Sequence, residues 1–221
     1  MKAEEILSKV DHTQLKAFAT WEDIMKICEE ALAYHTASVC VPPAYIRRIH
    51  ESYGERINIC TVVGFPLGYS TTPAKVAEIR QALEDGCNEI DMVINIADVK
   101  NGDYAKVEEE IRTLKKACDG HILKVIIETC YLNREEKIAM CKAVTNAGAD
   151  YIKTSTGFGT GGATKEDIEL FKENIGPDVK IKAAGGISTL EDLEMFVNLG
   201  CDRIGTSRAV GLLKGEATEG Y

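Results

Sequence analysis

The stretch Ala147-Gly148-Ala149-Asp150-Tyr151-Ile152 joins the end of a predicted helix to the start of a predicted strand. Glycine commonly follows the last turn of a helix, where the backbone becomes left-handed, and an apolar run then begins the strand. The same order recurs at Asp85-Gly-Cys-Asn-Glu-Ile90 and Leu199-Gly-Cys-Asp-Arg-Ile204. This weak internal repeat predicts a chain built from helix–strand units.

Short apolar runs alternate with segments of helical periodicity on both sides of these junctions. Several runs are apolar on both faces, as parallel strands covered by helices should be. The predicted strands are Lys9–His12, Ala37–Val41, Ile57–Val63, Glu89–Ile94, Leu123–Glu128, Tyr151–Thr154, Val179–Ala183 and Arg203–Gly205. The predicted helices are Glu22–Tyr34, Pro73–Asp85, Tyr104–Ala117, Glu135–Ala147, Lys165–Asn174 and Leu190–Leu199.

Eight such units without a linker predict an α/β protein in which residues 1–221 form a single (β/α)8 barrel, the TIM barrel. A doubly wound open sheet is the alternative. A short amphipathic helix is predicted at Met1–Ser8, before the first strand, where it would cover the bottom of the barrel.

Capping residues agree with these helices. Candidate N-caps with a side-chain oxygen are Thr72, Asn133, Thr164 and Ser188. Glu191 stands three residues after Ser188 and completes a capping-box pattern. Left-handed helix ends are expected at Gly86, Gly148 and Gly200.

Composition excludes several classes of protein. The chain has 26 Lys+Arg against 35 Asp+Glu, a net charge of −9, which disfavours nucleic-acid binding. A hydrophobic fraction of 45% excludes disorder as the main state, and no apolar run is long enough to span a membrane. The start of the chain lacks a secretory signal, so we expect a cytoplasmic protein. The eight cysteines form no C-x-x-C pair and the histidines are scattered, which indicates reduced thiols and disfavours a zinc site.

Two lysines stand near the ends of neighbouring predicted strands, where barrel enzymes carry their active sites: Lys153 and Lys182. Neighbouring strands lie about 4.8 Å apart, so both amines can enter one pocket. Two ammonium groups about 5 Å apart at an effective dielectric of about 20 repel by roughly 3.3 kcal/mol. Each would lower the pKa of the other, and a neutral amine can attack a carbonyl carbon. The alternative is that either lysine pairs with Asp91 or Glu128.

Two further strands contribute ionisable residues. Asp91 is either a pairing carboxylate or a proton shuttle beside the lysines. Lys124 and Glu128 share one face of the predicted fifth strand, and we expect them to pair with each other or to support the site.

Glycines follow the last two predicted strands, in Ala184-Gly-Gly-Ile-Ser188 and Gly205-Thr-Ser-Arg208. These loops form the usual phosphate site of the barrel, because glycine lets the backbone approach an anion closely. Ordinary turn chemistry is the alternative. The loop Gly157-Phe-Gly-Thr-Gly-Gly162 is expected to fold over the same ligand.

Seven segments, in order from residue 11 to about 210, resemble the deoxyribose-phosphate aldolase family. The most specific two contain the lysines, Tyr151–Phe158 and Val179–Ile187. The others are Asp11–Thr13, Val39–Pro42, Val63–Pro66, Glu89–Asn95 and Lys124–Thr129. The resemblance implies a class I aldolase, a lyase of carbohydrate and deoxyribonucleoside degradation that works through a Schiff base without metal or other cofactor. It implies reversible cleavage of 2-deoxy-D-ribose 5-phosphate to D-glyceraldehyde 3-phosphate and acetaldehyde.

The resemblance also implies residue roles. Lys153 matches the Schiff-base lysine, Lys182 the lysine that lowers its pKa, and Asp91 the proton-relay aspartate. Tyr221 matches a catalytic C-terminal tyrosine on a mobile tail. The implied substrate-binding positions are Thr13, Cys40, Gly157, Gly185, Gly186, Gly205 and Ser207. The implied partner is a small phosphosugar, with no nucleic acid or membrane, in a homodimer or homotetramer.

Three other functions remain open at this point. The first is a different imine-forming barrel aldolase acting on a keto acid or ketose phosphate. The second is a phosphosugar isomerase, which needs an acid–base pair and forms no imine. The third is a non-catalytic phosphosugar-binding protein.

Overall fold

The structure is a computed structural model that describes residues 2–215. Its eight parallel strands form one closed barrel in sequence order, with β1 paired to β8. The strands are β1 Val10–Thr13, β2 Ser38–Val41, β3 Ile59–Val63, β4 Glu89–Val93, β5 Ile122–Ile126, β6 Tyr151–Lys153, β7 Lys180–Ala184 and β8 Arg203–Thr206. The predicted (β/α)8 barrel is confirmed, and the open-sheet alternative is excluded.

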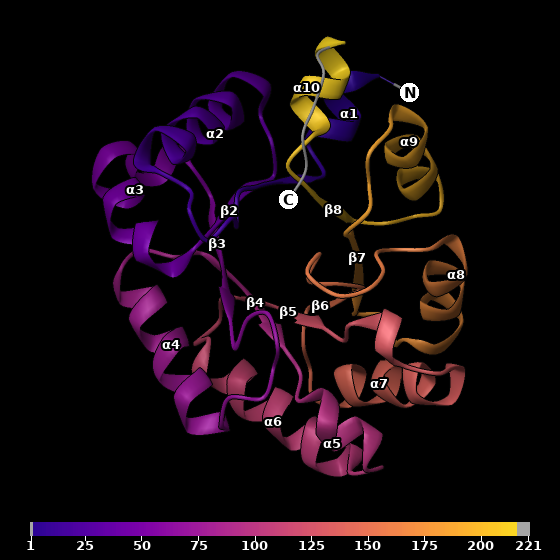
Figure 1. Cartoon of the computed structure of the whole chain (residues 1–221). Helices are drawn as coiled ribbons and strands as arrows, with labels where there is room; N and C mark the ends of the chain where they lie inside the picture. Colours follow the sequence, from indigo (N-terminus) through magenta and orange to yellow (C-terminus); the bar gives the residue numbers. More distant parts are fainter. Residues whose placement is uncertain (1, 216–221) are drawn as a thin grey trace.

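A ring of helices surrounds the barrel (Figure 1). The helices are α1 Ala3–Leu7, α2 Trp21–Tyr34, α3 Ile46–Tyr53, α4 Thr72–Glu84, α5 Ile96–Lys100, α6 Tyr104–Ala117, α7 Arg134–Asn146, α8 Lys165–Asn174, α9 Leu190–Asn198 and α10 Ala209–Lys214. The six longer helices predicted from periodicity are present. Helices α3, α5 and α10, of 8, 5 and 6 residues, were not predicted. Helices α5 and α10 are too short to show a clear period, whereas the i, i+3, i+7 spacing of Ile46, Ile49 and Tyr53 in α3 was a usable signal that was missed.

Helix α1 does not cover the bottom of the barrel. It lies in the outer ring, beside α10 (Figure 1), and it also contacts α9. Its apolar residues Ile6 and Leu7 are buried. A five-residue helix with two adjacent apolar residues can cover a gap in the ring, and the prediction of its position was wrong.

Two predicted N-caps are displaced by one residue. The cap of α4 is Thr71 rather than Thr72. The cap of α9 is Thr189 rather than Ser188, because the hydroxyl of Thr189 accepts a hydrogen bond from the amide of Asp192 at 3.0 Å. The capping box therefore uses Asp192 rather than Glu191.

The other predicted caps are confirmed. Asn133 and Thr164 cap α7 and α8 through their side chains. Left-handed backbone follows three helices, at Gly86, Gly148 and Gly200.

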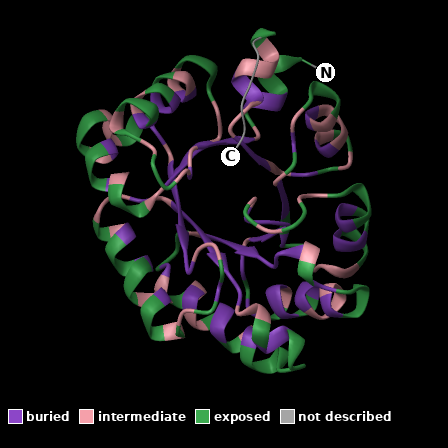
Figure 2. Cartoon of the chain, viewed as in Figure 1, coloured by how far each residue is buried: buried purple, intermediate pink, exposed green. Residues whose placement is uncertain are grey.

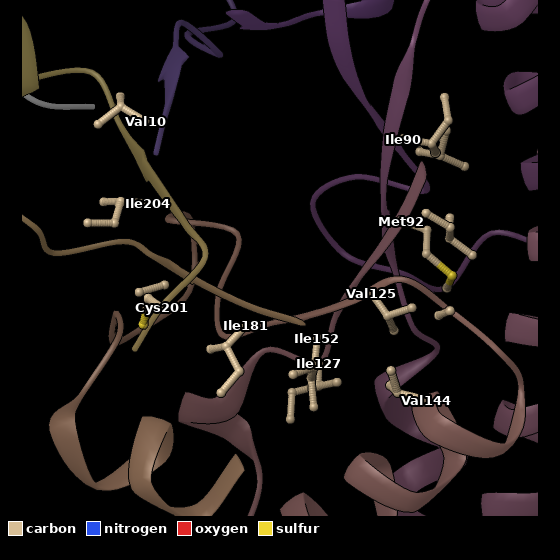
Figure 3. Packing of buried hydrophobic residues seen from close by; sticks show 14 of the residues in the cluster. Val10, Ile90, Met92, Val125, Ile127, Val144, Ile152, Ile181, Cys201 and Ile204 are labelled. Carbon is tan, nitrogen blue, oxygen red and sulfur yellow. The ribbon is translucent and has the colours of Figure 1, made fainter. Parts of the chain in front are cut away.

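Side chains of the strands alternate between two very different environments. The outward face is apolar and packs under the helices, whose solvent faces are exposed (Figure 2). Figure 3 shows part of this layer, with Val125, Ile152, Ile181 and Ile204 from four consecutive strands. The inward face carries charged side chains on six strands, so the expectation that strands are apolar on both faces was wrong there. This alternation follows from the two-residue period of a strand.

The outer apolar layer predicts a difference in stability effect between the buried face and the exposed face of α6. Leu114 is fully buried, whereas Lys116 is exposed. Leu114→Ala should lower the free energy of unfolding by about 2–5 kcal/mol, because it removes buried methyl groups and leaves a cavity. Lys116→Ala, the control, should change it by less than about 0.5 kcal/mol. Denaturant titration checks both values, and equal effects would contradict this account of the packing.

Candidate active site

Inward-facing side chains from six strands meet inside the barrel in one ionic network. We define the interior charge cluster as Asp11, Glu89, Asp91, Lys124, Lys153, Lys182 and Arg203. Strand period places these residues on one face: Glu89 and Asp91, for example, are two residues apart on β4. The sheet register then brings neighbouring strands together, with Lys153 beside Lys182 and Asp91 beside Lys124.

Lys153 and Lys182 converge on one oxygen atom. The Nζ atom of Lys153 lies 2.8 Å from Oδ2 of Asp91, and the Nζ atom of Lys182 lies 2.7 Å from the same oxygen. The three residues expected to share a site are therefore in direct contact. The alternative that the lysines pair with Asp91 also holds, so the carboxylate offsets the repulsion expected between two adjacent ammonium groups.

Lys182 has a second carboxylate partner in Asp11, from β1. Asp11 in turn accepts hydrogen bonds from Ser38 at 2.8 Å and from Arg203 at 2.6 Å. Closure of the barrel between β1 and β8 makes these contacts possible, since Asp11 and Lys182 are far apart in sequence. Lys182 is thus held on both sides by carboxylates, and its amine has little freedom to move.

Lys124 lies deeper in the same network. Its Nζ atom is 2.8 Å from Oδ1 of Asp91 and 2.6 Å from Glu89. The predicted pairing of Lys124 with Glu128 was wrong, because β5 ends before Glu128 and four residues of extended chain span about 13 Å. Glu128 instead accepts hydrogen bonds from Thr156. The second expectation, that Lys124 supports the site, agrees with its contact to Asp91.

Two members of the interior charge cluster, Asp91 and Lys182, keep their charges across neutral pH. Burial alone would raise the pKa of Asp91, but Lys124, Lys153 and Lys182 outweigh it and hold that pKa well below its usual value. Burial alone would lower the pKa of Lys182, but Asp11 and Asp91 outweigh it and raise that pKa above its usual value. Asp91 therefore remains a carboxylate and Lys182 remains an ammonium group.

The interior charge cluster contains one more cationic side chain than carboxylates. Four cations, namely three lysines and Arg203, face the three carboxylates of Asp11, Glu89 and Asp91. Among the residues that the structure describes, Lys153 is in ion-pair contact with Asp91 alone, whereas Lys182 contacts two carboxylates. The side chain of Lys153 is 4% exposed, whereas that of Lys182 is fully buried. Lys153 is therefore the lysine of the cluster with the fewest carboxylate contacts.

A small pocket of about 100 Å³ adjoins the cluster at the carboxyl ends of the last strands. It is lined by Gly157, Gly185, Gly186, Ile187, Gly205, Thr206, Ser207 and Arg208. Gly185 and Gly186 both have positive φ, which glycine adopts without strain. A Cβ atom at Gly205 would lie 3.1 Å from Cε of Lys182, so the pocket and the lysine are immediate neighbours. Glycine backbone with an arginine nearby is a suitable setting for an anion.

Five predicted substrate-binding residues line this pocket together: Gly157, Gly185, Gly186, Gly205 and Ser207. Thr13 lines a neighbouring pocket of about 160 Å³ that also includes Ser207, and its hydroxyl donates to the carbonyl of Asp11 at 2.8 Å. Cys40 is buried on β2 and packs in a small apolar cluster with Leu15 and Cys60. Tyr221 lies outside the described residues.

Within residues 2–215, two groups of side chains place possible metal-ligand atoms within 4.8 Å of one another. They are Cys40, Cys60 and Asp91, and Asp11, Cys60 and Glu89. Ammonium groups already contact the carboxylates of both groups: Lys124 contacts Asp91 and Glu89, and Lys182 contacts Asp11. A divalent cation would have to displace these ammonium groups, so the donor set suits amine chemistry better than a resident metal.

Sequence reasoning did not assign roles to several residues of the site. Asp11 and Arg203 stand at strand positions that face inward, and the two-residue period around each could have identified them. Arg208 directly follows the predicted phosphate residues, and its positive charge was a usable signal. The partners of Asp11 were not predictable, because they depend on barrel closure.

Comparisons with known proteins agree with this geometry. Residues 6–218 match the family described as DeoC/LacD family aldolase. A deoxyribose-phosphate aldolase of Clostridium botulinum is 73% identical over 221 residues, covering 100% of both chains. One from Streptococcus pyogenes is 56% identical over 219 residues, covering 99% of this chain and 98% of the relative.

A solved structure extends the similarity to the fold. The deoxyribose phosphate aldolase of Aeropyrum pernix, described as a unique tetrameric structure, superposes with a TM-score of 0.90 at 30% identity. The match covers 97% of this chain and 92% of that one. The family match spans nearly the whole barrel, including the interior charge cluster and the glycine-lined pocket. The chain therefore belongs to the DeoC/LacD family of aldolases.

Proposed function

We propose that this aldolase reversibly cleaves 2-deoxy-D-ribose 5-phosphate to D-glyceraldehyde 3-phosphate and acetaldehyde through a Schiff base on Lys153. One observation carries the proposal: the amines of Lys153 and Lys182 both lie within 2.8 Å of one Asp91 oxygen, beside a glycine-lined pocket. The names of the relatives from Clostridium botulinum and Streptococcus pyogenes support the substrate.

The reaction begins with the neutral amine of Lys153. It attacks C1 of the open-chain sugar, and loss of water gives a protonated imine that can accept electrons. A water held by Asp91 and Lys182 takes the proton of the C3 hydroxyl, the C2–C3 bond breaks, and its electron pair forms an enamine on Lys153. D-Glyceraldehyde 3-phosphate leaves. The enamine is then protonated, and hydrolysis releases acetaldehyde and the free amine.

The charges around Lys153 suit these steps. Lys182 stays cationic, so it disfavours a second positive charge on Lys153 and favours the neutral amine. Asp91 stays anionic and stabilises the positive charge of the imine when it forms. This differs from simple repulsion between two lysines, because Asp91 sits between them and Asp11 holds Lys182 in place.

The phosphate group of the substrate is proposed to bind in the pocket lined by Gly185, Gly186, Gly205 and Ser207, with Gly157 at its edge. Arg208 adds a positive side chain to this set. Anchoring the phosphate fixes the far end of the sugar, so that the carbonyl carbon is presented to Lys153. Thr13, Cys40 and Tyr221 remain proposed members of the site.

The three other functions are less well supported. A phosphosugar isomerase has no need for a second lysine beside the first, and a binding protein has no need for a cluster with an excess cation. A different imine-forming aldolase would use the same lysine, and the names of the relatives favour the deoxyribose phosphate.

The assembly and location of the protein are also proposals. The tetrameric relative from Aeropyrum pernix supports a homo-oligomer, either a dimer or a tetramer, of a chain that acts as one domain. No described helix has the length and apolar character needed to cross a membrane. The eight cysteines are free thiols, which fits a reducing compartment such as the cytoplasm.

Borohydride trapping tests the identity of the reacting amine. Incubation with 2-deoxyribose 5-phosphate and borohydride should add a reduced carbon chain to Lys153, because borohydride reduces the imine to a stable amine. Peptide mapping by mass spectrometry locates the added mass. Lys153→Ala should abolish both the adduct and the release of acetaldehyde, and turnover that survives this substitution would refute the mechanism.

The proposed role of Lys182 predicts a change in pH dependence. Lys182→Leu removes a fixed positive charge beside Lys153, so the pH of half-maximal imine trapping should rise by about one unit or more, roughly 1.4 kcal/mol per unit. Lys75→Met is a matched control, since Lys75 is a buried lysine that pairs with Glu110 outside the interior charge cluster. An unchanged midpoint in Lys182→Leu, or an equal shift in the control, would remove the proposed role.

A further inference from the structure

A buried glutamate outside the interior charge cluster holds the loop that follows β6. Glu128 is 1% exposed, and its carboxyl group accepts hydrogen bonds from both the amide and the hydroxyl of Thr156. The amide bond measures 3.1 Å. Neither residue has a part in the chemistry proposed above, yet a buried carboxyl group is costly unless its partners repay the loss of water.

The backbone at Glu128 is held in an unusual conformation. Its φ is 52° and its ψ 66°, the left-handed region that residues with a Cβ rarely occupy. The residues on either side stay paired with the β6 segment: the amide of Ile127 donates to Lys153 at 3.1 Å and that of Thr129 to Thr154 at 2.9 Å. Strain of this kind persists where surrounding contacts fix the chain, and it gathers at functional sites.

Thr156 also holds the next residues of the loop in place through its hydroxyl. Its hydroxyl accepts a hydrogen bond from the amide of Phe158 at 3.0 Å, so Gly157 is bracketed between two fixed neighbours. The loop also packs directly on the glutamate, because a Cβ atom at Gly159 would lie 3.1 Å from Cδ of Glu128.

Gly157 belongs both to this restrained loop and to the glycine-lined pocket of about 100 Å³, which we call the anion pocket. It lines the pocket together with Gly185, and a Cβ atom at Gly185 would lie 3.4 Å from the Cα atom of Gly157. A shift of the β6 loop would therefore change the shape of the pocket without moving the Lys153 amine, which is held by Asp91.

We propose that Glu128 and Thr156 are positioning residues that set the affinity for the phosphate group by holding Gly157 at the wall of the anion pocket. This inference rests on the proposed function, since it assigns the pocket to the phosphate of the substrate. The proposal gives two parts of one site different roles. The interior charge cluster performs the bond cleavage, and the Glu128–Thr156 contact sets the preference for a phosphorylated sugar.

The test compares 2-deoxyribose 5-phosphate with unphosphorylated 2-deoxyribose, and uses inorganic phosphate as a competitive inhibitor. Thr156→Val keeps the shape of the side chain but removes the hydroxyl. It should raise KM for the phosphorylated sugar and Ki for inorganic phosphate by about tenfold, because Gly157 would then have to be ordered at the pocket wall when the phosphate binds. The kcat for the phosphorylated sugar and the kcat/KM for 2-deoxyribose should change by less than about twofold. Thr156→Ser restores the hydroxyl and should return KM close to the original value.

A double-mutant cycle tests whether the two residues act as one unit. Glu128→Ala should raise KM in the same way, and Thr156→Val should add little in that background. An equal loss of kcat/KM for both sugars, an unchanged KM and Ki, or full additivity of the two substitutions would overturn the inference. Failure of the proposed function would look different, because the unaltered enzyme would then release no acetaldehyde from either sugar and give no borohydride adduct.

Discussion

The carboxylate of Asp91 is the contact on which the interior of the barrel depends. Its Oδ2 atom binds the amines of Lys153 and Lys182, and its Oδ1 atom binds Lys124. Three ammonium groups could not be buried this close together without a shared anion, because the desolvation of each would go uncompensated. Glu89, from the same strand as Asp91, and Asp11, from β1, add two further carboxylates, so that the interior charge cluster has one carboxylate fewer than cationic side chains. The reactivity proposed for Lys153 follows from that shortage.

The barrel makes this arrangement possible by separating two environments across the thickness of one sheet. Outward-facing Val and Ile residues pack under the helices, and Figure 3 shows several of them. The strands are buried inside the ring of helices (Figure 2). Inward-facing positions, which in many barrels hold branched apolar residues, here hold charges on six of the eight strands. Rigid strands fix the distances among these charges, whereas the loops beyond the strand ends supply the glycines of the anion pocket. The groups proposed for bond cleavage and those proposed for phosphate binding therefore lie on different parts of the barrel.

Local patterns in the sequence predict most of the fold. Gly148 and its equivalents mark helix ends, and the apolar runs that follow mark strands, so the repeating unit and hence the closed barrel are predictable. Strand position also predicts that Lys153 and Lys182 lie together, and both amines contact Asp91. The glycines after β7 and β8 line one cavity as expected. Helices such as α5 escape prediction because a few residues cannot show a period.

Contacts that depend on closure of the barrel, or on the residue at which a strand ends, were harder to predict than the helices and strands themselves. Asp11 lies far from Lys182 in sequence, and their contact exists because β1 pairs with β8. The predicted Lys124–Glu128 pair failed because an extended chain separates residues four apart, and because the left-handed backbone at Glu128 is not visible in the sequence. The ion pairs of Lys182 likewise follow from the three-dimensional arrangement, so its charge is held by carboxylates as well as opposed by a neighbouring amine.

Lys153 is proposed to be the member of the interior charge cluster that loses a proton and reacts as a neutral amine. Carbon-13 NMR of lysine labelled at Cε measures this directly, since the chemical shift distinguishes an amine from an ammonium group, and Lys153→Met assigns the signal. The account predicts that at neutral pH, without substrate, the signal lost in Lys153→Met is that of a neutral amine, whereas the signal lost in Lys182→Met is that of an ammonium group. An ammonium signal for Lys153 throughout the pH range in which the enzyme turns over would contradict the account.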